Sequence, residues 1–176
     1  MKVDICDIPA EGLHLEITED GNELQAIAGE VDFLILSPVS ADLTLLKSEG
    51  EIFVRGDMTA PLKLQCARCL KEVEHRINSR IDIVYTLTPE HKAKEKELTL
   101  EDVGADYLEG DEIDINAVLV EQLSLDTPMQ PVCRPDCKGL CPKCGADLNQ
   151  RECSCIVTEH TDQKFAMLKE LKLNKK

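Results

Sequence analysis

The 176-residue chain carries 34 acidic residues against 20 Lys and Arg residues, which gives a formal net charge of −14. Aromatic residues make up only 3% of the chain and Trp is absent. A module that stacks single-stranded bases on exposed aromatic rings is therefore not expected. An acidic chain is also repelled by phosphate backbones and anionic lipids unless its basic residues are clustered. A chain of this length can bury a hydrophobic core without the help of a metal ion.

The N-terminus, Met1 to Ile5, lacks the charged start and the long apolar stretch of a signal peptide. No apolar run approaches the roughly 18 residues of a membrane-spanning helix. We therefore expect a soluble, cytoplasmic protein that has no membrane partner. In a reducing compartment, the nine cysteines favour metal binding or redox chemistry over stable disulfides.

Alternating apolar residues in the first 88 positions predict antiparallel strands, which form a meander or a partly open barrel. Residues 48–51 predict a hairpin turn, and further turns or links are expected at 19–22 and 37–38. The expected core residues are Leu34, Leu36, Leu43, Leu45, Ile52, Val54, Leu62, Leu64, Ile81 and Ile83. Cys6 stands alone and is expected to be a small buried residue.

Residues 89–112 are polar and acidic and predict a loop. Residues 114–125 predict a helix, because Asp114 can cap it and four apolar residues fall on one face. These four residues are Ile115, Val118, Leu119 and Leu123. A final helix is expected after Asp162, and its lysine-rich end suits the negative end of a helix.

The expected fold class is α+β: a β meander or partly open barrel, a C-terminal cysteine-rich metal-binding segment, and one or two helices. Residues 1–88 form the β-rich core domain, 89–112 the loop, and 113–176 the helix, the cysteine cluster and the C-terminal helix. Since the first segment is expected to hold a core of its own, loss of metal should disorder the tail and leave most of the sheet intact.

Six cysteines fall between positions 133 and 155 and predict a structural zinc site. The stretch Cys141-Pro142-Lys143-Cys144-Gly145 has the form of a zinc knuckle, in which two intervening residues let both sulfurs reach one ion. A tetrahedral site needs four ligands, and Cys153 and Cys155 are the first choice for the other two. Cys133 and Cys137 are the reserve ligands.

Cys66-Ala67-Arg68-Cys69 has the spacing of a second knuckle at the tip of a hairpin. It could form a second site with Cys133 and Cys137, or a ribbon-like site with Cys141 and Cys144. A third interpretation is a redox dithiol, which prefers the N-terminus of a helix. No helix is expected after Cys69. The four histidines are far apart in sequence, and no catalytic motif or phosphate-binding glycine loop is present, so neither an enzyme nor a small-molecule substrate is expected.

Charge is distributed in blocks along the chain. Residues 1–60 carry a net −10 and residues 101–132 a net −9, whereas residues 61–100 and 133–176 carry +2 and +3. The two basic blocks are also those that contain paired cysteines, which suggests a molecule with an acidic face and basic, cysteine-bearing ends. The candidate RNA-binding residues are Arg68, Lys71, Arg76, Arg80, Arg134, Lys138 and Lys143.

Several short stretches together resemble the YceD family of bacterial and plastid proteins, which is named for accumulation of the large ribosomal RNA subunit. They are Cys66-Ala67-Arg68-Cys69-Leu70 after a β run, Val120-Glu121-Gln122-Leu123, Pro128, Cys137-Lys138-Gly139-Leu140-Cys141-Pro142-Lys143-Cys144-Gly145 and Leu148-Asn149. The likeness covers residues 30–156. Some members of that family lack the C-terminal cysteines and keep the equivalents of Cys66 and Cys69.

The resemblance implies a non-enzymatic role in making or stabilising large-subunit rRNA. The family's gene is often neighbour to that of a small, basic large-subunit ribosomal protein. The partners implied are therefore large-subunit rRNA, a basic large-subunit ribosomal protein, or both, with the protein bridging the two. The alternatives are a zinc-ribbon RNA-binding module and a thiol-disulfide oxidoreductase that uses Cys66 and Cys69.

Overall fold

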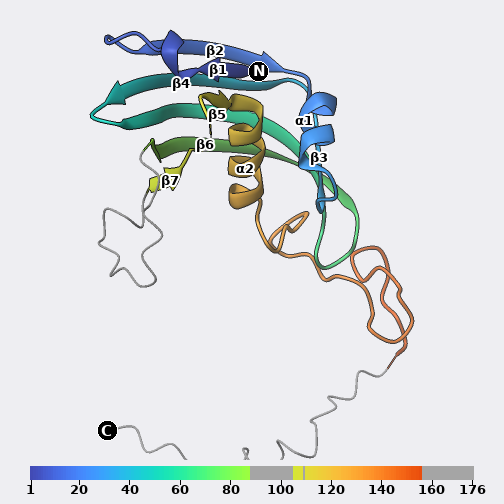
Figure 1. The fold of residues 1–176 in the computed structure, drawn as a ribbon. Coiled ribbons are helices and arrows are strands. Elements are labelled where there is room, and N and C mark those ends of the chain that lie inside the picture. Colours follow the sequence, from blue (N-terminus) through green and yellow to red (C-terminus); the bar gives the residue numbers. More distant parts are fainter. Residues whose placement is uncertain (88–104, 109, 156–176) are drawn as a thin grey trace, which may run out of the picture.

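The computed structural model describes residues 1–87, 105–108 and 110–155. A curved, open sheet forms the body, with the strand order β2-β4-β5-β6-β7 (Figure 1). Strands β2 to β6 are antiparallel, and β7 joins β6 in parallel. The strands span Leu13–Glu19 (β2), Val39–Ser48 (β4), Glu51–Gln65 (β5), Glu72–Thr86 (β6) and Ala105–Tyr107 (β7). The sheet does not close into a barrel, and the expected α+β class is confirmed.

Three short strands complete the described sheets. Strand β3 (Phe33–Ile35) pairs with the end of β5, beyond the part of β5 that pairs with β4. The link predicted at residues 37–38 joins β3 to β4, and the peptide bond between Ser37 and Pro38 is cis. Strands β1 (Lys2–Asp4) and β8 (Glu112–Asp114) form a separate two-stranded sheet.

The predicted hairpin turn at residues 48–51 is confirmed, since it joins β4 to β5. Glu49 and Gly50 both have positive φ, at 47° and 88°. Two consecutive residues of this kind match the right-handed twist of the flanking strands. The turn sets the register in which Leu43, Leu45, Ile52 and Val54 are all buried on one face.

Two helices lie on the same face of the sheet (Figure 1). The helix predicted at 114–125 is α2 (Ile115–Asp126), and the Asp114 carboxylate accepts hydrogen bonds from the N–H groups of Asn116 and Ala117. Its four predicted apolar residues are all buried. Helix α1 (Gly21–Ala28) was not predicted; its N-cap, Asp20, lies where only a turn was expected.

One hydrophobic core unites the sheet with both helices. It contains residues of β1 to β6, Leu24 of α1 and the buried face of α2. The core therefore includes residues on both sides of the boundary drawn at position 113, and independent folding of residues 1–88 stays a prediction. None of the helices in the described ranges is both long and apolar enough to cross a membrane.

Three expectations about local structure were wrong. In β3 the buried residues are Phe33 and Ile35, whereas Leu34 is 44% exposed and Leu36 is only partly buried. Within the expected loop at 89–112, residues 105–107 form β7. Cys6 is exposed, because its N–H binds the Asp4 carboxylate in a short 3-10 turn in which Ile5 is the buried residue. The rest of the expected loop up to residue 104 and the expected helix after Asp162 lie outside the described residues.

Candidate metal centres

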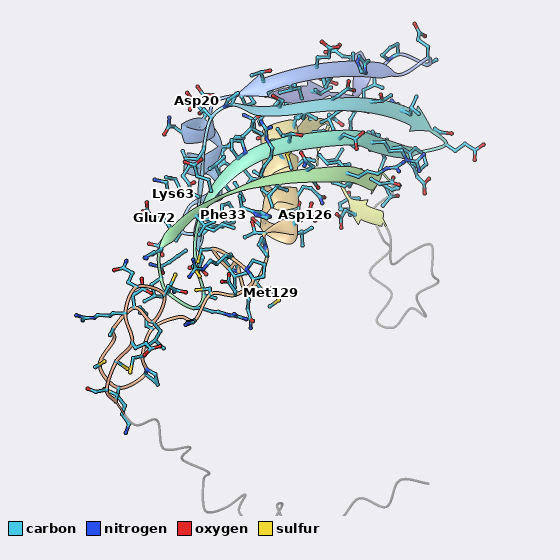
Figure 2. All side chains as sticks on the ribbon, turned by 180° about the vertical axis from the view of Figure 1, so that it is seen from behind. Asp20, Phe33, Lys63, Glu72, Asp126 and Met129 are labelled. Atoms are coloured by element: carbon cyan, nitrogen blue, oxygen red, sulfur yellow. The ribbon has the colours of Figure 1, made fainter. Side chains whose placement is uncertain are left out.

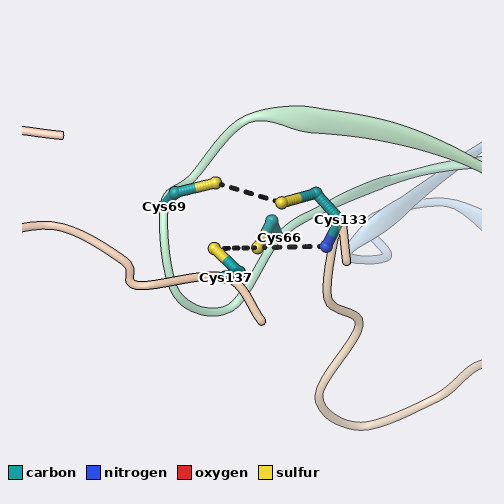
Figure 3. Close-up of side chains that lie close together, drawn as sticks. All are labelled: Cys66, Cys69, Cys133 and Cys137. Carbon is teal, nitrogen blue, oxygen red and sulfur yellow. Dashed lines mark hydrogen bonds between the residues drawn. The ribbon is translucent and has the colours of Figure 1, made fainter. Parts of the chain in front are cut away.

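The connection between β5 and β6 forms a cysteine knuckle. Its backbone closes through hydrogen bonds from Leu70 N–H to the Cys66 carbonyl (2.9 Å) and from Cys66 N–H to the Lys71 carbonyl (2.8 Å). Leu70 has a φ of 60°, in the left-handed region that a tight knuckle requires. The turn leaves Cys66 and Cys69 buried, with their sulfurs facing the segment that follows α2 (Figure 3).

Two further cysteines reach this knuckle from residues 131–137. Ala67 N–H donates to the Pro131 carbonyl (2.8 Å), and Cys133 N–H donates to Cys66 Sγ (3.4 Å). Cys69 Sγ lies 3.7 Å from Cys133 Sγ, and Cys66 Sγ lies 4.0 Å from Cys137 Sγ (Figure 3). We call the group of Cys66, Cys69, Cys133 and Cys137 site 1.

The second group is built within one local segment. Gly145 N–H donates to the Cys141 carbonyl (2.9 Å) and Cys141 N–H to the Ala146 carbonyl (2.8 Å), so residues 141–146 form another knuckle. Gly145 has a φ of 69°. Cys141 and Cys144 of this knuckle face Cys153 and Cys155, and we call these four residues site 2.

The geometry of both groups suits a tetrahedral metal ion. In each group all four Sγ atoms lie within 4.8 Å of one another. Four ligands at about 2.3 Å from a tetrahedral ion lie about 3.8 Å apart, close to the distances found in site 1. A disulfide needs about 2.05 Å between sulfurs, and all nine cysteines are free. The two tetra-cysteine clusters are thus consistent with two metal ions.

The surrounding protein shifts the pKa values of the cysteine thiols in different directions. Backbone N–H groups lower the pKa of Cys66 to about 6, with Cys69 as the largest contributor, and those of Cys144 and Lys143 do the same for Cys141. Burial and the neighbouring thiols raise the pKa of Cys133 to about 12. The hydrogen bond with Cys144, followed by burial, raises that of Cys155 to about 12. Four such thiols become thiolates together only when a cation balances their charge.

Each site uses a different part of the sequence-based prediction. The first-choice ligand set, Cys141, Cys144, Cys153 and Cys155, is brought together as site 2. The pair Cys66 and Cys69 meets the reserve pair, Cys133 and Cys137, rather than the knuckle of site 2. Cys66 and Cys69 therefore face thiols from a distant segment (Figure 3). Metal binding by these residues stays a prediction.

Three of the seven candidate RNA-binding residues make contacts that hold the cysteine-bearing loops. The Arg68 guanidinium donates to the carbonyls of Cys137 (2.9 Å) and Pro135 (3.3 Å). Lys71 Nζ lies 2.7 Å from Asp147 Oδ2, and Arg134 donates to Asn149 Oδ1 (3.0 Å). These side chains thus use part of their hydrogen-bonding and ion-pairing capacity within the protein, which leaves less of it for RNA.

The other four candidates are Arg76 and Arg80 on β6 and Lys138 and Lys143 near site 2, and all four are exposed. On β6, residues 77, 79 and 81 are buried beneath the helices, so Arg76 and Arg80 lie on the opposite face. Within the described ranges neither arginine has a salt bridge, although Arg80 lies opposite Asp57 in the β5–β6 register.

The thiolates change the charge of this end of the molecule. Residues 66–71 and 133–155 contain six basic and three acidic residues, a net +3 if the thiols are neutral. A divalent ion held by four thiolates carries about −2, so two loaded sites would contribute about −4. The basic residues around the clusters would then largely neutralise the metal centres.

Sequence reasoning did not identify two polar residues that lie between the sites. Asn149 Nδ2 donates to Cys137 Sγ (3.4 Å), and Asp147 receives both the Lys71 ammonium and the Asn149 backbone N–H. The signal that could have found them is their position in the short loop between the two cysteine pairs of site 2. A third group, formed by His14, Glu16 and Asp42, is exposed on β2 and β4, with His14 Nδ1 3.6 Å from Asp42 Oδ1.

Comparisons of the sequence with known proteins identify a family and several relatives. The family model described as large ribosomal RNA subunit accumulation protein YceD matches residues 54–172. An uncharacterized protein of Mycobacterium tuberculosis is 36% identical over 101 residues, which cover 57% of this chain and 46% of that protein. An Arabidopsis thaliana protein, named as a chloroplastic YCED homolog 1 for large ribosomal RNA subunit accumulation, is 23% identical over 178 residues, 88% of this chain and 52% of that protein.

The chain spans about half the length of the curated relatives it matches. No solved structure matches it. The family model covers more than half of the chain, including most of strand β5, all of β6 and α2, and both cysteine clusters. The chain therefore belongs to the YceD family of large ribosomal RNA subunit accumulation proteins.

Proposed function

We propose that this protein is a non-enzymatic, zinc-stabilised factor in the accumulation of large-subunit ribosomal RNA. In this proposal its acidic edge binds a basic large-subunit ribosomal protein, while basic side chains on the exposed face of β6 contact rRNA. The observation that carries the proposal is the separation of charge across the sheet. The family name supports the link to large-subunit rRNA.

The acidic edge consists of residues 1–30, which form β1, β2 and α1 and contain eight acids and one base. Strand β2 is one end of the sheet order, and its exposed acids include Glu16. A basic protein is attracted to such a surface, and complementary charge of this kind speeds association at low salt. An rRNA backbone is repelled by the same surface.

The basic side chains lie away from β2, at the end of the β5–β6 hairpin. Residues 63–80, which end β5, form the first knuckle and begin β6, contain five bases and two acids. Figure 2 shows the sulfur atoms beyond Lys63 and Glu72, at the end of the β5–β6 hairpin. Arg76 and Arg80 lead along β6 toward this end, so they are the best placed of the seven candidates for phosphate contacts.

Zinc is the metal we propose for both sites. Tetra-cysteine ligation in a tetrahedral arrangement is typical of structural zinc, and closed sites of this type have no open position for a reaction. Elemental analysis of protein purified without chelator should find about two zinc ions per chain. Iron at this stoichiometry, or fully reduced thiols without metal, would rule zinc out.

The test of the charge model compares two double variants that change the net charge by the same amount. In Arg76→Ala/Arg80→Ala, affinity for large-subunit rRNA fragments should fall and the slope of log K against log salt should decrease by about two. Lys2→Ala/Lys47→Ala, which loses two bases elsewhere, should leave both quantities unchanged. Equal effects in the two double variants would show that only net charge matters and would contradict the assignment of the β6 face.

A second comparison addresses the acidic edge. Glu11→Gln/Glu16→Gln/Glu23→Gln should weaken binding to basic large-subunit ribosomal proteins, with most of the loss in the association rate. Glu49→Gln/Glu51→Gln/Glu152→Gln removes the same charge from other exposed positions and should have a smaller effect. Salt-sensitive binding to RNA alone, with no affinity for any basic large-subunit protein, would favour the zinc-ribbon RNA-binding module instead.

A further inference from the structure

A network of polar contacts joins the two cysteine clusters, and most of its members are residues other than the cysteines. Site 1 connects segments far apart in sequence, since Cys69 and Cys133 are 64 residues apart. Site 2 lies within residues 141–155. Three residues separate Cys137 of site 1 from Cys141 of site 2 along the chain, and their conformation places one knuckle against the other.

The first contact is made by backbone. Leu140 N–H donates to the Arg68 carbonyl of the site 1 knuckle (3.0 Å). Gly139, with a φ of 74°, approaches this carbonyl so closely that a Cβ atom at Gly139 would be 2.9 Å from the Arg68 oxygen. Leu148 N–H in turn donates to the Gly139 carbonyl (3.0 Å), so the site 2 loop rests on the site 1 knuckle.

The second contact is an ion pair across the two sites. Lys71 follows the site 1 knuckle, and its Nζ is 2.7 Å from Oδ2 of Asp147 in the site 2 loop. The Asp147 side chain is 16% exposed, and the Lys71 ammonium is the main cause that lowers its pKa to about 2. The other carboxylate oxygen, Oδ1, receives the backbone N–H and the side-chain amide of Asn149, both at 2.9 Å.

The third contact reaches a ligand of site 1 directly. Asn149, held by Asp147, donates from Nδ2 to Cys137 Sγ (3.4 Å). Its Oδ1 accepts from Lys138 N–H (2.8 Å) and from Arg134 Nη2 (3.0 Å). One side chain from the site 2 loop thus fixes the position of Cys137 and stabilises its thiolate. Donors of this kind orient metal ligands, and their loss reduces metal affinity by about 10–100-fold.

We infer that metal occupancy at the two sites is positively coupled, and that Asn149 is the positioning residue that transmits the coupling. Metal at site 2 closes the loop between Cys144 and Cys153 and thereby holds Asn149 against Cys137. Metal at site 1 orders the knuckle and Lys71, on which that loop rests. Because the coupling free energy between two binding sites is reciprocal, metal at either site raises the metal affinity of the other by the same factor. The inference depends on both clusters binding metal.

The experiment is a titration of the reduced, metal-free chain with Co2+, followed through the sulfur-to-cobalt absorption bands and competed with Zn2+. Cys144→Ser leaves site 1 alone, and Cys69→Ser leaves site 2 alone. The product of the two binding constants in the native chain should exceed the product of the two isolated constants by about tenfold or more. Equality of these products would overturn the inference.

Asn149→Ala supplies the second measurement, since it removes no cysteine. It should reduce the two-site product about tenfold and should have little effect in the Cys144→Ser background, where the loop is already open. Gln150→Ala, a change at the exposed neighbouring residue, should keep the native value. An unchanged product in Asn149→Ala, or an equal loss in Gln150→Ala, would show that Asn149 does not transmit coupling. If neither site binds metal, both the metal assignment and the coupling fail, and the binding tests of the charge model are unaffected.

Discussion

Leu70 follows Cys69 in the same left-handed backbone conformation that Gly145 adopts after Cys144, with φ values of 60° and 69°. The two knuckles therefore place equivalent backbone behind their second cysteine, although only one uses glycine. An L-residue in this region costs about 1–2 kcal/mol relative to the right-handed region. Leu70 is 53% exposed, so burial of its side chain offsets only part of this cost.

We predict that Leu70→Gly is tolerated. Glycine removes the steric cost at this φ but increases the conformational entropy of the unfolded chain, so the free energy of unfolding should rise by about 0–1 kcal/mol. Denaturant unfolding of the metal-loaded protein measures this change. A loss of more than about 1 kcal/mol would show that the Leu70 side chain makes a stabilising contact that its exposure does not suggest.

Alanine at Gly139 and Gly145, the two positive-φ glycines of the cysteine-rich segment, should have unequal effects. Gly145→Ala adds a Cβ atom to open space and should cost only the conformational term, about 1 kcal/mol. Gly139→Ala has the same strain and also places Cβ against the Arg68 carbonyl, so it should separate the two knuckles and cost clearly more. Chelator competition at each site measures the difference. Equal losses would mean that the close approach of residue 139 to Arg68 does not matter.

Much of the sheet could be predicted because its signals are local. The turn at Glu49-Gly50 and the strict alternation at Leu43/Leu45 and Ile52/Val54 each define strand and register within a few residues. The three residues of β3 and Leu36 after it are all apolar, so alternation could not decide which face is buried, and pairing with β5 does. Asp20-Gly21-Asn22 suits a turn as well as a helix cap, and the packing of Gly21 against the backbone of Ile35 and Leu36 fixes the helix.

The sequence predicts the two cysteine knuckles of the candidate sites, but it does not predict which cysteine pairs come together. Spacing identified both knuckles, because two intervening residues are enough to bring two thiols to one ion. Spacing could not determine that Cys66 and Cys69 meet Cys133 and Cys137, since that contact depends on where α2 ends relative to the β5–β6 hairpin. The polar contacts of Asn149 and Asp147 are also tertiary, and so are the contacts that occupy Arg68 and Lys71.

Removal of metal should affect the two ends of the molecule differently. The main hydrophobic core contains none of the eight ligand cysteines, three of which form a separate small cluster, so the sheet and the helices should keep their circular dichroism after chelation. Residues 130–155, which bury few apolar side chains, should become sensitive to protease. Cys144→Ser should produce the same sensitivity, whereas Cys6→Ser, at the exposed cysteine outside both sites, should not. Unfolding of the whole chain in one step on chelation would contradict this separation.

Helix α2 should be indispensable to the sheet, because its buried face belongs to the same core. Leu119 is fully buried, and Leu119→Ala should reduce the free energy of unfolding by about 2–5 kcal/mol through loss of apolar contacts and the cavity that remains. Leu125→Ala, on the same helix but at a residue that is 73% exposed, should change it by less than about 0.5 kcal/mol. If Leu119→Ala left the sheet's unfolding transition in place, residues 1–88 would fold on a core of their own.

Metal uptake should release fewer protons than the number of ligand thiols at neutral pH. In a knuckle that keeps its backbone turn without metal, backbone N–H groups lower the pKa of Cys66 and Cys141 to about 6, so each site then contains one thiolate at pH 7.5. The pKa values of Cys133 and Cys155 are raised to about 12, and metal must displace these protons. Binding should therefore release fewer than four protons per site at pH 7.5. The number released should approach four as the pH falls below about 6, and metal affinity should decrease as the pH falls.

Calorimetric titration in buffers of different ionisation enthalpy counts the protons. Release of four per site at pH 7.5 would show that the backbone N–H groups of the knuckles do not stabilise thiolates before the metal binds.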